Sequence, residues 1–301
     1  MNSTDLNSIV INFDPNQVFL LNICLGILMF GVALDLKITD FKYVLVNIKG
    51  VITGVISQWI LLHLLTIGLV LILKPEYSLA LGMALIAACP GGNVSNYAVH
   101  LSGANAALSV ILTIISTIFC ALSTPFIFSL IKSVIVISEN SSINFAINFN
   151  DMLSTIAQLI LFPLALGFSF VHFMPKWTSY IKDFVKKLSL LIFIGFVIVA
   201  LIGNLENLKS YVGAVFIIVL IHNGIALMIG YYWSRKIMKL PIADSRTISI
   251  ETGIQNSGLA LILIFNFFDG LGGMALIAAW WSIWHLITSL TLALYWKRSM
   301  N

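Results

Sequence analysis

The sequence predicts an all-α membrane protein with nine transmembrane helices, arranged as an inverted structural repeat in which two helices are broken. Three observations support this fold class. Only 9% of the 301 residues are charged and 59% are hydrophobic, whereas an average soluble protein has roughly 25% charged residues. Nine apolar segments are long enough to cross a bilayer, and the third and the eighth contain glycine-rich interruptions. A soluble fold is therefore excluded, and no nucleic-acid partner is implied, because the basic residues lie in short loops.

Windows of about 19 apolar residues, the length that crosses roughly 30 Å of hydrocarbon, define the nine spans. They cover residues 18–36, 50–73, 78–101, 104–131, 152–173, 185–204, 211–234, 245–268 and 271–296. Residues 1–17 are polar and acidic and contain no Lys or Arg, so they do not resemble a signal peptide. We expect them to form an extracellular N-terminal segment, and we expect residues 297–301 to form a cytoplasmic tail.

The loop charges orient these spans. With nine crossings the termini lie on opposite faces, and all 16 Lys and Arg residues except Lys74, Lys132 and Lys209 then fall on one face. The positive-inside rule makes this face cytoplasmic. The sequence thus predicts a multi-pass protein of the cell membrane with its N-terminus outside and its C-terminus in the cytoplasm.

Two spans contain polar interruptions that disfavour an unbroken helix. The third reads Cys-Pro-Gly-Gly-Asn-Val-Ser-Asn at residues 89–96, and the eighth reads Glu-Thr-Gly-Ile-Gln-Asn-Ser-Gly at residues 251–258. Proline lacks an amide and glycine favours other backbone conformations, so both helices should break. Backbone groups freed by a break cannot face lipid. We therefore expect the breaks to face each other inside the protein, the alternative being two unrelated kinks in a structural membrane protein.

The positions of the two breaks indicate an inverted repeat. When the fifth span is set aside, spans one to four and six to nine form two sets that enter the membrane from opposite sides. The broken helix is the third in each set. Interrupted helices in matching positions of inverted halves point to the midplane binding site of a secondary transporter.

Glu251 is the only acidic residue deep in any predicted span. An ionised carboxylate at the bilayer centre costs about 2.5–3.5 kcal/mol on insertion scales, so it needs a cation or a proton. Oxygen-bearing side chains that could accompany it are Gln58, Ser95, Asn96, Ser109, Thr113 and Gln255. Such a set suits a monovalent ion such as sodium better than calcium or a transition metal. A proton on Glu251 is the alternative, because burial favours the neutral carboxyl.

These motifs resemble the bile acid:sodium symporter (BASS) family over nearly the whole chain. The similar stretches are Cys-Pro-Gly-Gly-x-x-Ser-Asn at 89–96, Ala-Leu-Ser-Val at 107–110, Glu-x-Gly-x-Gln-Asn-Ser-Gly at 251–258, and Trp284-His285. The resemblance implies a panel domain, formed by residues 18–49 and 152–204, and a core domain, formed by residues 50–131 and 211–296. In the core, the two broken helices would cross.

The resemblance also implies two sodium ions that share Glu251. The residues implied for the first site are Ser95, Asn96, Ser109, Thr113 and Glu251. For the second site they are the side chains of Gln58, Glu251 and Gln255 with the carbonyls of Thr252 and Ile254. The substrate, an organic anion, would lie near Asn93, Val94, Asn256 and His285, where the amides at half-helix N-termini favour negative charge.

The sequence therefore predicts a sodium-coupled symporter, not an enzyme, that imports an organic anion by alternating access. A proton-coupled or uncoupled carrier of the same fold is the alternative. An intramembrane hydrolase is disfavoured, because the chain contains no HExxH or GxSxG motif. Bile acids, pantoate-like acids and keto acids are all compatible substrates. The lipid bilayer is the expected environment, and no obligatory protein partner is predicted.

Overall fold

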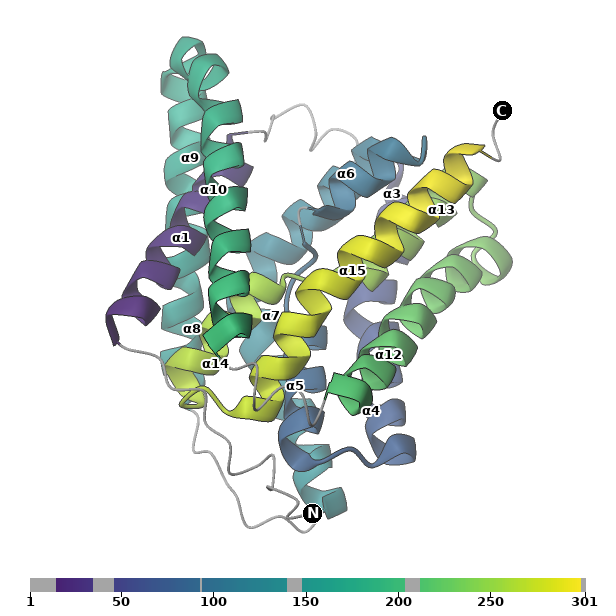
Figure 1. The fold of residues 1–301 in the computed structure, drawn as a ribbon. Coiled ribbons are helices and arrows are strands. Elements are labelled where there is room, and N and C mark those ends of the chain that lie inside the picture. Colours follow the sequence, from purple (N-terminus) through teal and green to yellow (C-terminus); the bar gives the residue numbers. More distant parts are fainter. Residues whose placement is uncertain (1–14, 35–45, 93, 140–147, 204–211, 299–301) are drawn as a thin grey trace.

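The computed structural model describes residues 15–34, 46–92, 94–139, 148–203 and 212–298, and every regular element in these ranges is a helix (Figure 1). In chain order the helices are α1 (Pro15–Ala33), α3 (Ile48–Ile56), η2 (Ser57–Leu61), α4 (Leu62–Leu73), α5 (Tyr77–Ala88), α6 (Val94–Leu101), α7 (Ala106–Glu139), α8 (Phe149–Ile156), η3 (Ala157–Leu161), α9 (Phe162–Phe173), α10 (Pro175–Gly203), α12 (Val212–Tyr232), η4 (Trp233–Ile237), α13 (Ile242–Gly253), α14 (Ser257–Phe267) and α15 (Gly272–Arg298). The elements η2, η3 and η4 are π-helical turns that continue the α-helices around them.

Five helices in the described ranges are long and apolar enough to cross a membrane. They run over residues 48–73, 106–135, 149–173, 213–237 and 272–298. The boundaries differ most from the predicted ones at α7, which extends to Glu139, and at α10, which begins at Pro175. Hydropathy locates the hydrocarbon-spanning part of a helix, whereas polar residues can continue the same helix outside it. Proline is also well suited to the first position of a helix, so α10 begins ahead of its apolar segment.

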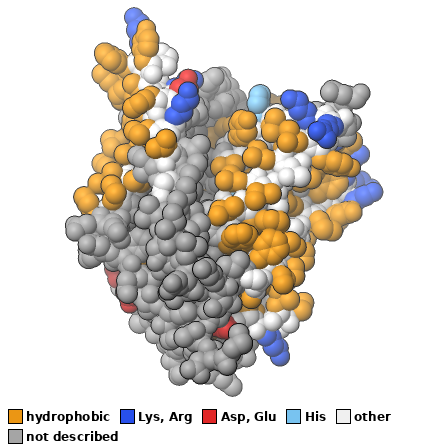
Figure 2. Space-filling model, in the orientation of Figure 1, with side chains coloured by type: hydrophobic (Ala, Val, Ile, Leu, Met, Phe, Trp, Pro, Cys, Tyr) orange, Lys and Arg blue, Asp and Glu red, His pale blue; other side chains and the backbone are white. Residues whose placement is uncertain are grey.

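The surface of these helices is apolar. Ile72, Phe126, Phe162 and Phe173 are each more than half exposed, and Figure 2 shows hydrophobic side chains gathered on the right of the view and along its upper left edge. Soluble monomers rarely expose apolar patches of this size. The chain is therefore a multi-pass membrane protein. The predicted orientation stays a prediction, and three of the basic residues behind it, Lys37, Lys42 and Lys209, lie outside the described ranges.

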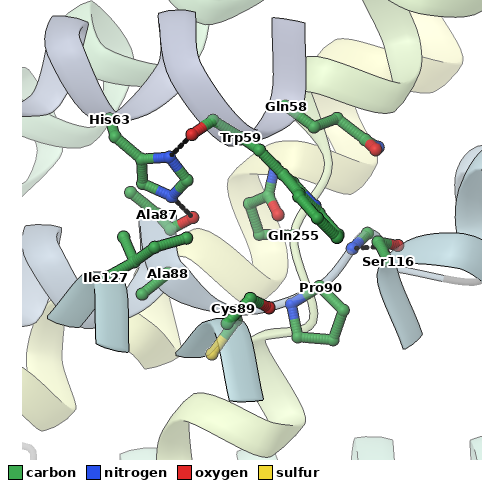
Figure 3. Close-up of a pocket in the computed structure, with 12 residues that line it drawn as sticks. Gln58, Trp59, His63, Ala87, Ala88, Cys89, Pro90, Ser116, Ile127 and Gln255 are labelled. Atoms are coloured by element: carbon green, nitrogen blue, oxygen red, sulfur yellow. Dashed lines mark hydrogen bonds between the residues drawn. The ribbon is translucent and has the colours of Figure 1, made fainter. Parts of the chain in front are cut away.

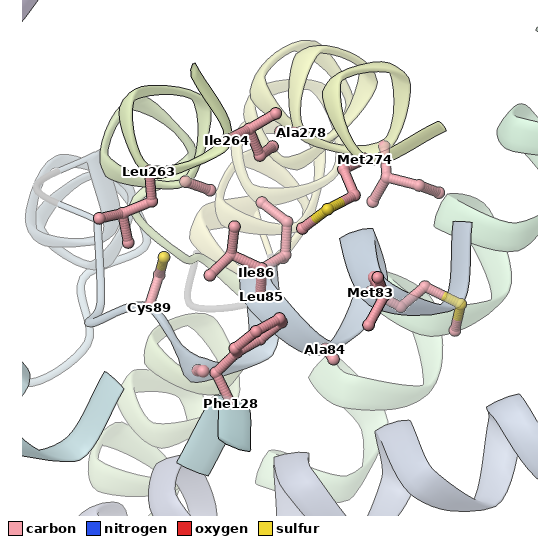
Figure 4. Packing of buried hydrophobic residues seen from close by; sticks show 14 of the residues in the cluster. Met83, Ala84, Leu85, Ile86, Cys89, Phe128, Leu263, Ile264, Met274 and Ala278 are labelled. Atoms are coloured by element: carbon pink, nitrogen blue, oxygen red, sulfur yellow. The ribbon is translucent and has the colours of Figure 1, made fainter. Parts of the chain in front are cut away.

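The helices form two groups in Figure 1. Helix α1 packs against α9 and α10, and α10 packs against α9, so these three lie together along one side. Among the remaining helices, α4, α7, α14 and α15 pack against α5, in which all twelve residues are buried. Figure 4 shows Met83, Leu85 and Ile86 of α5 among hydrophobic side chains of neighbouring helices. A helix that is apolar on every side belongs in the interior of a large bundle, and α5 occupies that place.

Two helices are interrupted inside this bundle. Helix α5 ends at Ala88 and α6 begins at Val94, while α13 ends at Gly253 and α14 begins at Ser257. The unwound segments run antiparallel to each other, with Gly91 opposite Gln255. The amide of Gly92 donates to the carbonyl of Ile254 at 3.2 Å, and the amide of Asn256 donates to the carbonyl of Pro90 at 2.8 Å. The freed backbone groups thus find partners in each other, as burial away from water requires.

Candidate functional site

Glu251 lies in the last turn of α13, next to the crossing of the two unwound segments, and is fully buried. Its Oε1 atom accepts hydrogen bonds from Ser95 Oγ at 2.5 Å and from Ser109 Oγ. Its Oε2 atom accepts from Thr113 Oγ1 at 3.2 Å and from Gln58 Nε2 at 3.3 Å. Four side chains from three other helical segments therefore converge on one carboxylate.

Helix geometry explains this convergence. Ser95 lies in the first turn of α6, directly after the break, so the unwound segment delivers its hydroxyl to the crossing. Ser109 and Thr113 lie four residues apart in α7, a spacing that places both hydroxyls on one helix face. The amide oxygen of Asn96 completes the group, because it lies 2.8 Å from Ser109 Oγ. The structure thus brings together all five residues expected at the first sodium site.

The oxygens of this group outnumber the protons available to them. Ser95 Oγ lies 2.7 Å from the carbonyl oxygen of Gly92 and 2.5 Å from Glu251 Oε1. Ser109 Oγ likewise contacts both Asn96 Oδ1 and Glu251 Oε1. Each hydroxyl carries one proton, and carboxylate, carbonyl and amide oxygens only accept. With Glu251 ionised, each of these two serines therefore leaves one of its oxygen contacts without a proton, a gap that a hard cation or a proton on Glu251 fills.

Gln58 brings a further amide oxygen close to Glu251. It lies in the π-helical turn η2 and donates from Nε2 to the backbone carbonyl of Glu251 at 3.0 Å. Its Oε1 atom is buried and has no hydrogen-bond partner among the described residues. A buried amide oxygen normally has a partner. This oxygen is therefore suited to act as a ligand of a cation.

The other members expected at the second sodium site lie in the unwound segment after α13. Gln255 is buried, and its Nε2 donates to the carbonyl of Thr252 at 3.0 Å. The carbonyl of Ile254 accepts from the Gly92 amide. Each carbonyl oxygen has two lone pairs, so both can still face an ion. Gln58 and Gln255 line one small pocket together with Ser116 and with Pro90 and Gly91 of the first break (Figure 3).

Two glycines allow the unwound segments to approach this closely. A Cβ atom on Gly91 would lie 3.3 Å from both Gln58 Nε2 and Glu251 Oε2, and one on Gly92 would lie 3.0 Å from the backbone oxygen of Gln255. Contacts this short are tighter than ordinary side-chain packing. The Pro-Gly-Gly motif is therefore needed both to break the helix and to admit the opposite segment.

The residues expected near the substrate are less closely connected. Val94 is the half-buried first residue of α6, and Asn256 caps α14 by accepting from the amide of Leu259 at 3.0 Å. His285 is buried in α15, which packs against both α6 and α14. Asn93 lies outside the described residues. A substrate role for these four residues stays a prediction.

Several polar residues outside the predicted set of site residues also support the site. Ser57 Oγ lies 2.7 Å from Thr252 Oγ1, Ser116 Oγ accepts from the Gly91 amide at 3.2 Å, and Asn223 Nδ2 donates to the carbonyl of Gly253 at 2.7 Å. Each lies in a helix that is mostly apolar. Such residues often bond within their own helix, so their type alone does not reveal a role at the breaks.

A bundle of apolar helices with two interrupted members and a buried cation-compatible oxygen cluster defines a membrane transporter. The profile of the Sodium Bile acid symporter family matches residues 22–211. The chain belongs to this family, as the motifs indicated, and thus to a family of transporters and not to a class of enzymes.

Relatives with known names extend over almost the whole chain. The chain is 33% identical to the uncharacterized sodium-dependent transporter YocS of Bacillus subtilis (strain 168), over 93% of this chain and 84% of that protein. It is 30% identical to the probable sodium/metabolite cotransporter BASS2, chloroplastic, of Oryza sativa subsp. japonica, over 91% of this chain and 68% of the relative. It is 31% identical to the probable sodium/metabolite cotransporter BASS1, chloroplastic, of Arabidopsis thaliana, over 91% of this chain and 66% of that relative.

Proposed function

We propose that the protein is a sodium-coupled symporter that imports an organic anion across the cell membrane by alternating access. The observation that carries this proposal is the oxygen cluster around Glu251. Around this one buried carboxylate, Ser95 and Ser109 each have a single proton for two acceptor oxygens. A monovalent hard cation balances the carboxylate charge and uses the remaining lone pairs. The names of the relatives, a sodium-dependent transporter and sodium/metabolite cotransporters, support the choice of sodium.

Two sodium ions are proposed, one on each side of Glu251. The first site consists of Ser95, Asn96, Ser109, Thr113 and Glu251. The second consists of Gln58, Glu251 and Gln255 with the carbonyls of Thr252 and Ile254. The unpartnered Oε1 atom of Gln58 supports the second site. Glu251 belongs to both sites, and both ions would hold the same arrangement of the two broken helices, so binding of one ion should favour binding of the other.

The proposed architecture has nine crossings, with the N-terminus outside and the C-terminus in the cytoplasm. The panel domain would comprise α1, α8 to α9 and α10, and the core domain the remaining helices. The mutual packing of α1, α9 and α10 on one side supports this division. The inverted repeat is supported by the two broken helices, which pair antiparallel at their breaks. Movement of one domain against the other would then expose the crossing to alternate faces.

An organic anion fits the charge pattern at the crossing. Helices α6 and α14 both begin at the breaks, at Val94 and Ser257. Helix N-termini carry a partial positive charge and free amides, which favour a carboxylate. Two bound sodium ions add to this positive potential. Sodium would therefore prepare the crossing for the anion, and coupling follows because each ligand favours the same arrangement of the two broken helices.

Thermal unfolding of the purified protein in detergent tests the proposal. A ligand that binds only the folded state stabilises it by RT ln(1 + [L]/Kd), which is about 2.7 kcal/mol at 100 times Kd. We expect a higher melting temperature in sodium chloride than in potassium or choline chloride of equal ionic strength. Equal melting temperatures in the three salts, together with uptake driven by a pH gradient, would instead indicate the proton-coupled carrier. Competition of labelled carboxylates for uptake would then identify the substrate class.

A further inference from the structure

His63 joins two parts of the structure that the proposed sodium sites depend on. It lies in α4, just after the π-helical turn η2, and its side chain is buried. Its Nδ1 atom lies 2.6 Å from the carbonyl oxygen of Trp59, and its Nε2 atom lies 2.9 Å from the carbonyl oxygen of Ala87 (Figure 3). Trp59 follows Gln58 in the π-helical turn, and Ala87 lies in the last turn of α5. One imidazole ring therefore spans the turn that carries Gln58 and the end of the first broken helix.

The carbonyl of Ala87 needs such a partner. The last four carbonyls of a helix have no amide within the helix to bond to, and in a membrane interior an unsatisfied carbonyl costs several kcal/mol. Thr124 Oγ1 of α7 donates to the carbonyl of Ala88 at 2.8 Å. At the other break, Asn223 of α12 donates to the carbonyl of Gly253. Side chains from neighbouring helices thus cap both half-helices, and capping alone is a structural role.

His63 differs from Thr124 because it also contacts the turn that carries Gln58. Carbonyl oxygens only accept, so the ring bonds to both of them when both nitrogens carry hydrogen, and a neutral ring bonds only to the carbonyl that its single N–H faces. With Nε2 as the donor, the ring ties the helical segment that follows η2 to the end of α5. Gln58, His63, Ala87 and Gln255 all line the same pocket. The orientation of Gln58 toward that pocket therefore depends on how η2 is held against α5.

We propose that His63 is a positioning residue for sodium binding, which acts through Gln58. This inference rests on the proposed function, because it assumes that Gln58 is a sodium ligand. The ring keeps η2 in register with the end of α5, so that Gln58 Oε1 is already placed before the ion arrives. Without the ring, sodium binding must also order this turn, and the affinity falls.

The test compares variants of the full-length protein in detergent by thermal unfolding at increasing sodium concentration, with choline keeping the ionic strength constant. His63→Leu should raise the sodium concentration for half-maximal stabilisation by about fivefold to tenfold, the equivalent of one lost hydrogen bond. Thr124→Val is the matched control, since it removes a cap from the same half-helix without touching η2. Thr124→Val should lower the melting temperature in choline. It should leave the sodium concentration for half-maximal stabilisation, here called the sodium half-point, within twofold of the wild type.

A double variant shows whether His63 acts through Gln58. In a Gln58→Leu background, His63→Leu should cause no further change in the remaining sodium half-point, because the group it positions is gone. If His63→Leu does not yield folded protein, His63→Gln keeps an amide donor but loses the span between the two carbonyls, and the same direction of change is expected.

Each outcome separates this inference from the proposed function. An unchanged half-point in the folded His63 variant, or an equal shift in Thr124→Val, would overturn the positioning role and leave sodium coupling intact. A full additional shift in the Gln58→Leu background would also overturn it. A wild-type protein whose melting temperature does not respond to sodium would overturn both.

Discussion

The backbone amide of Asn256 donates a 2.8 Å hydrogen bond to the carbonyl of Pro90 and so ties together two helices that are far apart in the sequence. Proline has no amide, so it can take part in this pairing only as an acceptor. The amide of Gly92, donating to Ile254, completes the exchange. The two interruptions are therefore one structural unit, and the oxygen cluster around Glu251 depends on both halves of the chain.

Removal of the central carboxylate is the most direct test of this unit. We expect Glu251→Ala to abolish sodium-dependent uptake and the stabilisation by sodium, while the protein still folds and inserts. Asp244→Asn is the matched control. Asp244 is another buried acid of α13, but it contacts Asn47 and Asn105 and not the oxygen cluster. Reconstituted vesicles report the uptake, and full sodium-dependent uptake by Glu251→Ala would refute the assignment.

Loss of Gln58 should remove one of the two proposed sodium sites and keep the other. If one ion depends on Gln58, uptake by the wild type should rise with sodium concentration with a Hill coefficient near two, and uptake by Gln58→Leu with a coefficient near one. The reason is that Gln58 is absent from the first group of ligands, so one ion still binds. Initial uptake rates over a range of sodium concentrations give both coefficients. An unchanged coefficient in the variant would contradict the second site.

The close approach at the crossing predicts a strong effect of Gly92→Ala. The added Cβ would lie 3.0 Å from the backbone oxygen of Gln255, so one unwound segment must shift. We expect a lower melting temperature and loss of the sodium response. Gly68→Ala in α4 is the control, because its Cβ meets nothing within 4 Å and Ala favours a helix over Gly by up to about 1 kcal/mol. A sodium response of normal size in Gly92→Ala would show that the segments do not need this contact.

Asn223 should stabilise the second broken helix. Asn223→Ala leaves the carbonyl of Gly253 without its donor, and an unsatisfied buried group of this kind costs about 1–3 kcal/mol. Thr288→Val serves as the control. This variant loses the hydrogen bond from Thr288 to Asn223 Oδ1 but keeps the bond from Asn223 to the carbonyl of Gly253. Thermal unfolding in choline measures the difference. Equal melting temperatures of the two variants would argue against a capping role.

His285 provides a test of the substrate position. We expect His285→Ala to raise the substrate concentration for half-maximal uptake severalfold at saturating sodium, while the sodium half-point for thermal stabilisation stays unchanged. The expectation follows from the place of His285 on α15, which packs against both half-helices that begin at the breaks. A shifted sodium half-point with an unchanged substrate concentration would reverse this assignment and place His285 with the ion sites.

Much of the fold could be predicted because the bilayer leaves few options. An apolar segment that must satisfy its own backbone becomes a helix, so hydropathy locates the spans. The same constraint makes Pro90, Gly91 and Gly92 informative, since they interrupt a segment that otherwise has no reason to break. Glu251 was identifiable for a similar reason: it is a charge where charge is costly.

The remaining features depend on packing between distant residues. The π-helical turn at Ser57–Leu61 has no marker in its own sequence, yet it determines where Gln58 points. The roles of His63 and Asn223 do not show in the sequence, because their carbonyl partners lie on other helices. The grouping of α1 with α9 and α10 is implied only by the family resemblance, because apolar composition does not encode which helices face each other.

The solitary carboxylate at the crossing also determines the electrical character of the transport cycle. Two sodium ions bound around one ionised Glu251 leave a net charge of +1, and a monovalent anion brings the loaded crossing to neutrality. Since Glu251 stays in the protein, the proposed cycle of two sodium ions and one monovalent anion would carry one positive charge inward. Import should therefore be electrogenic, and a membrane potential that is negative inside would drive it by about 2.3 kcal/mol per 100 mV.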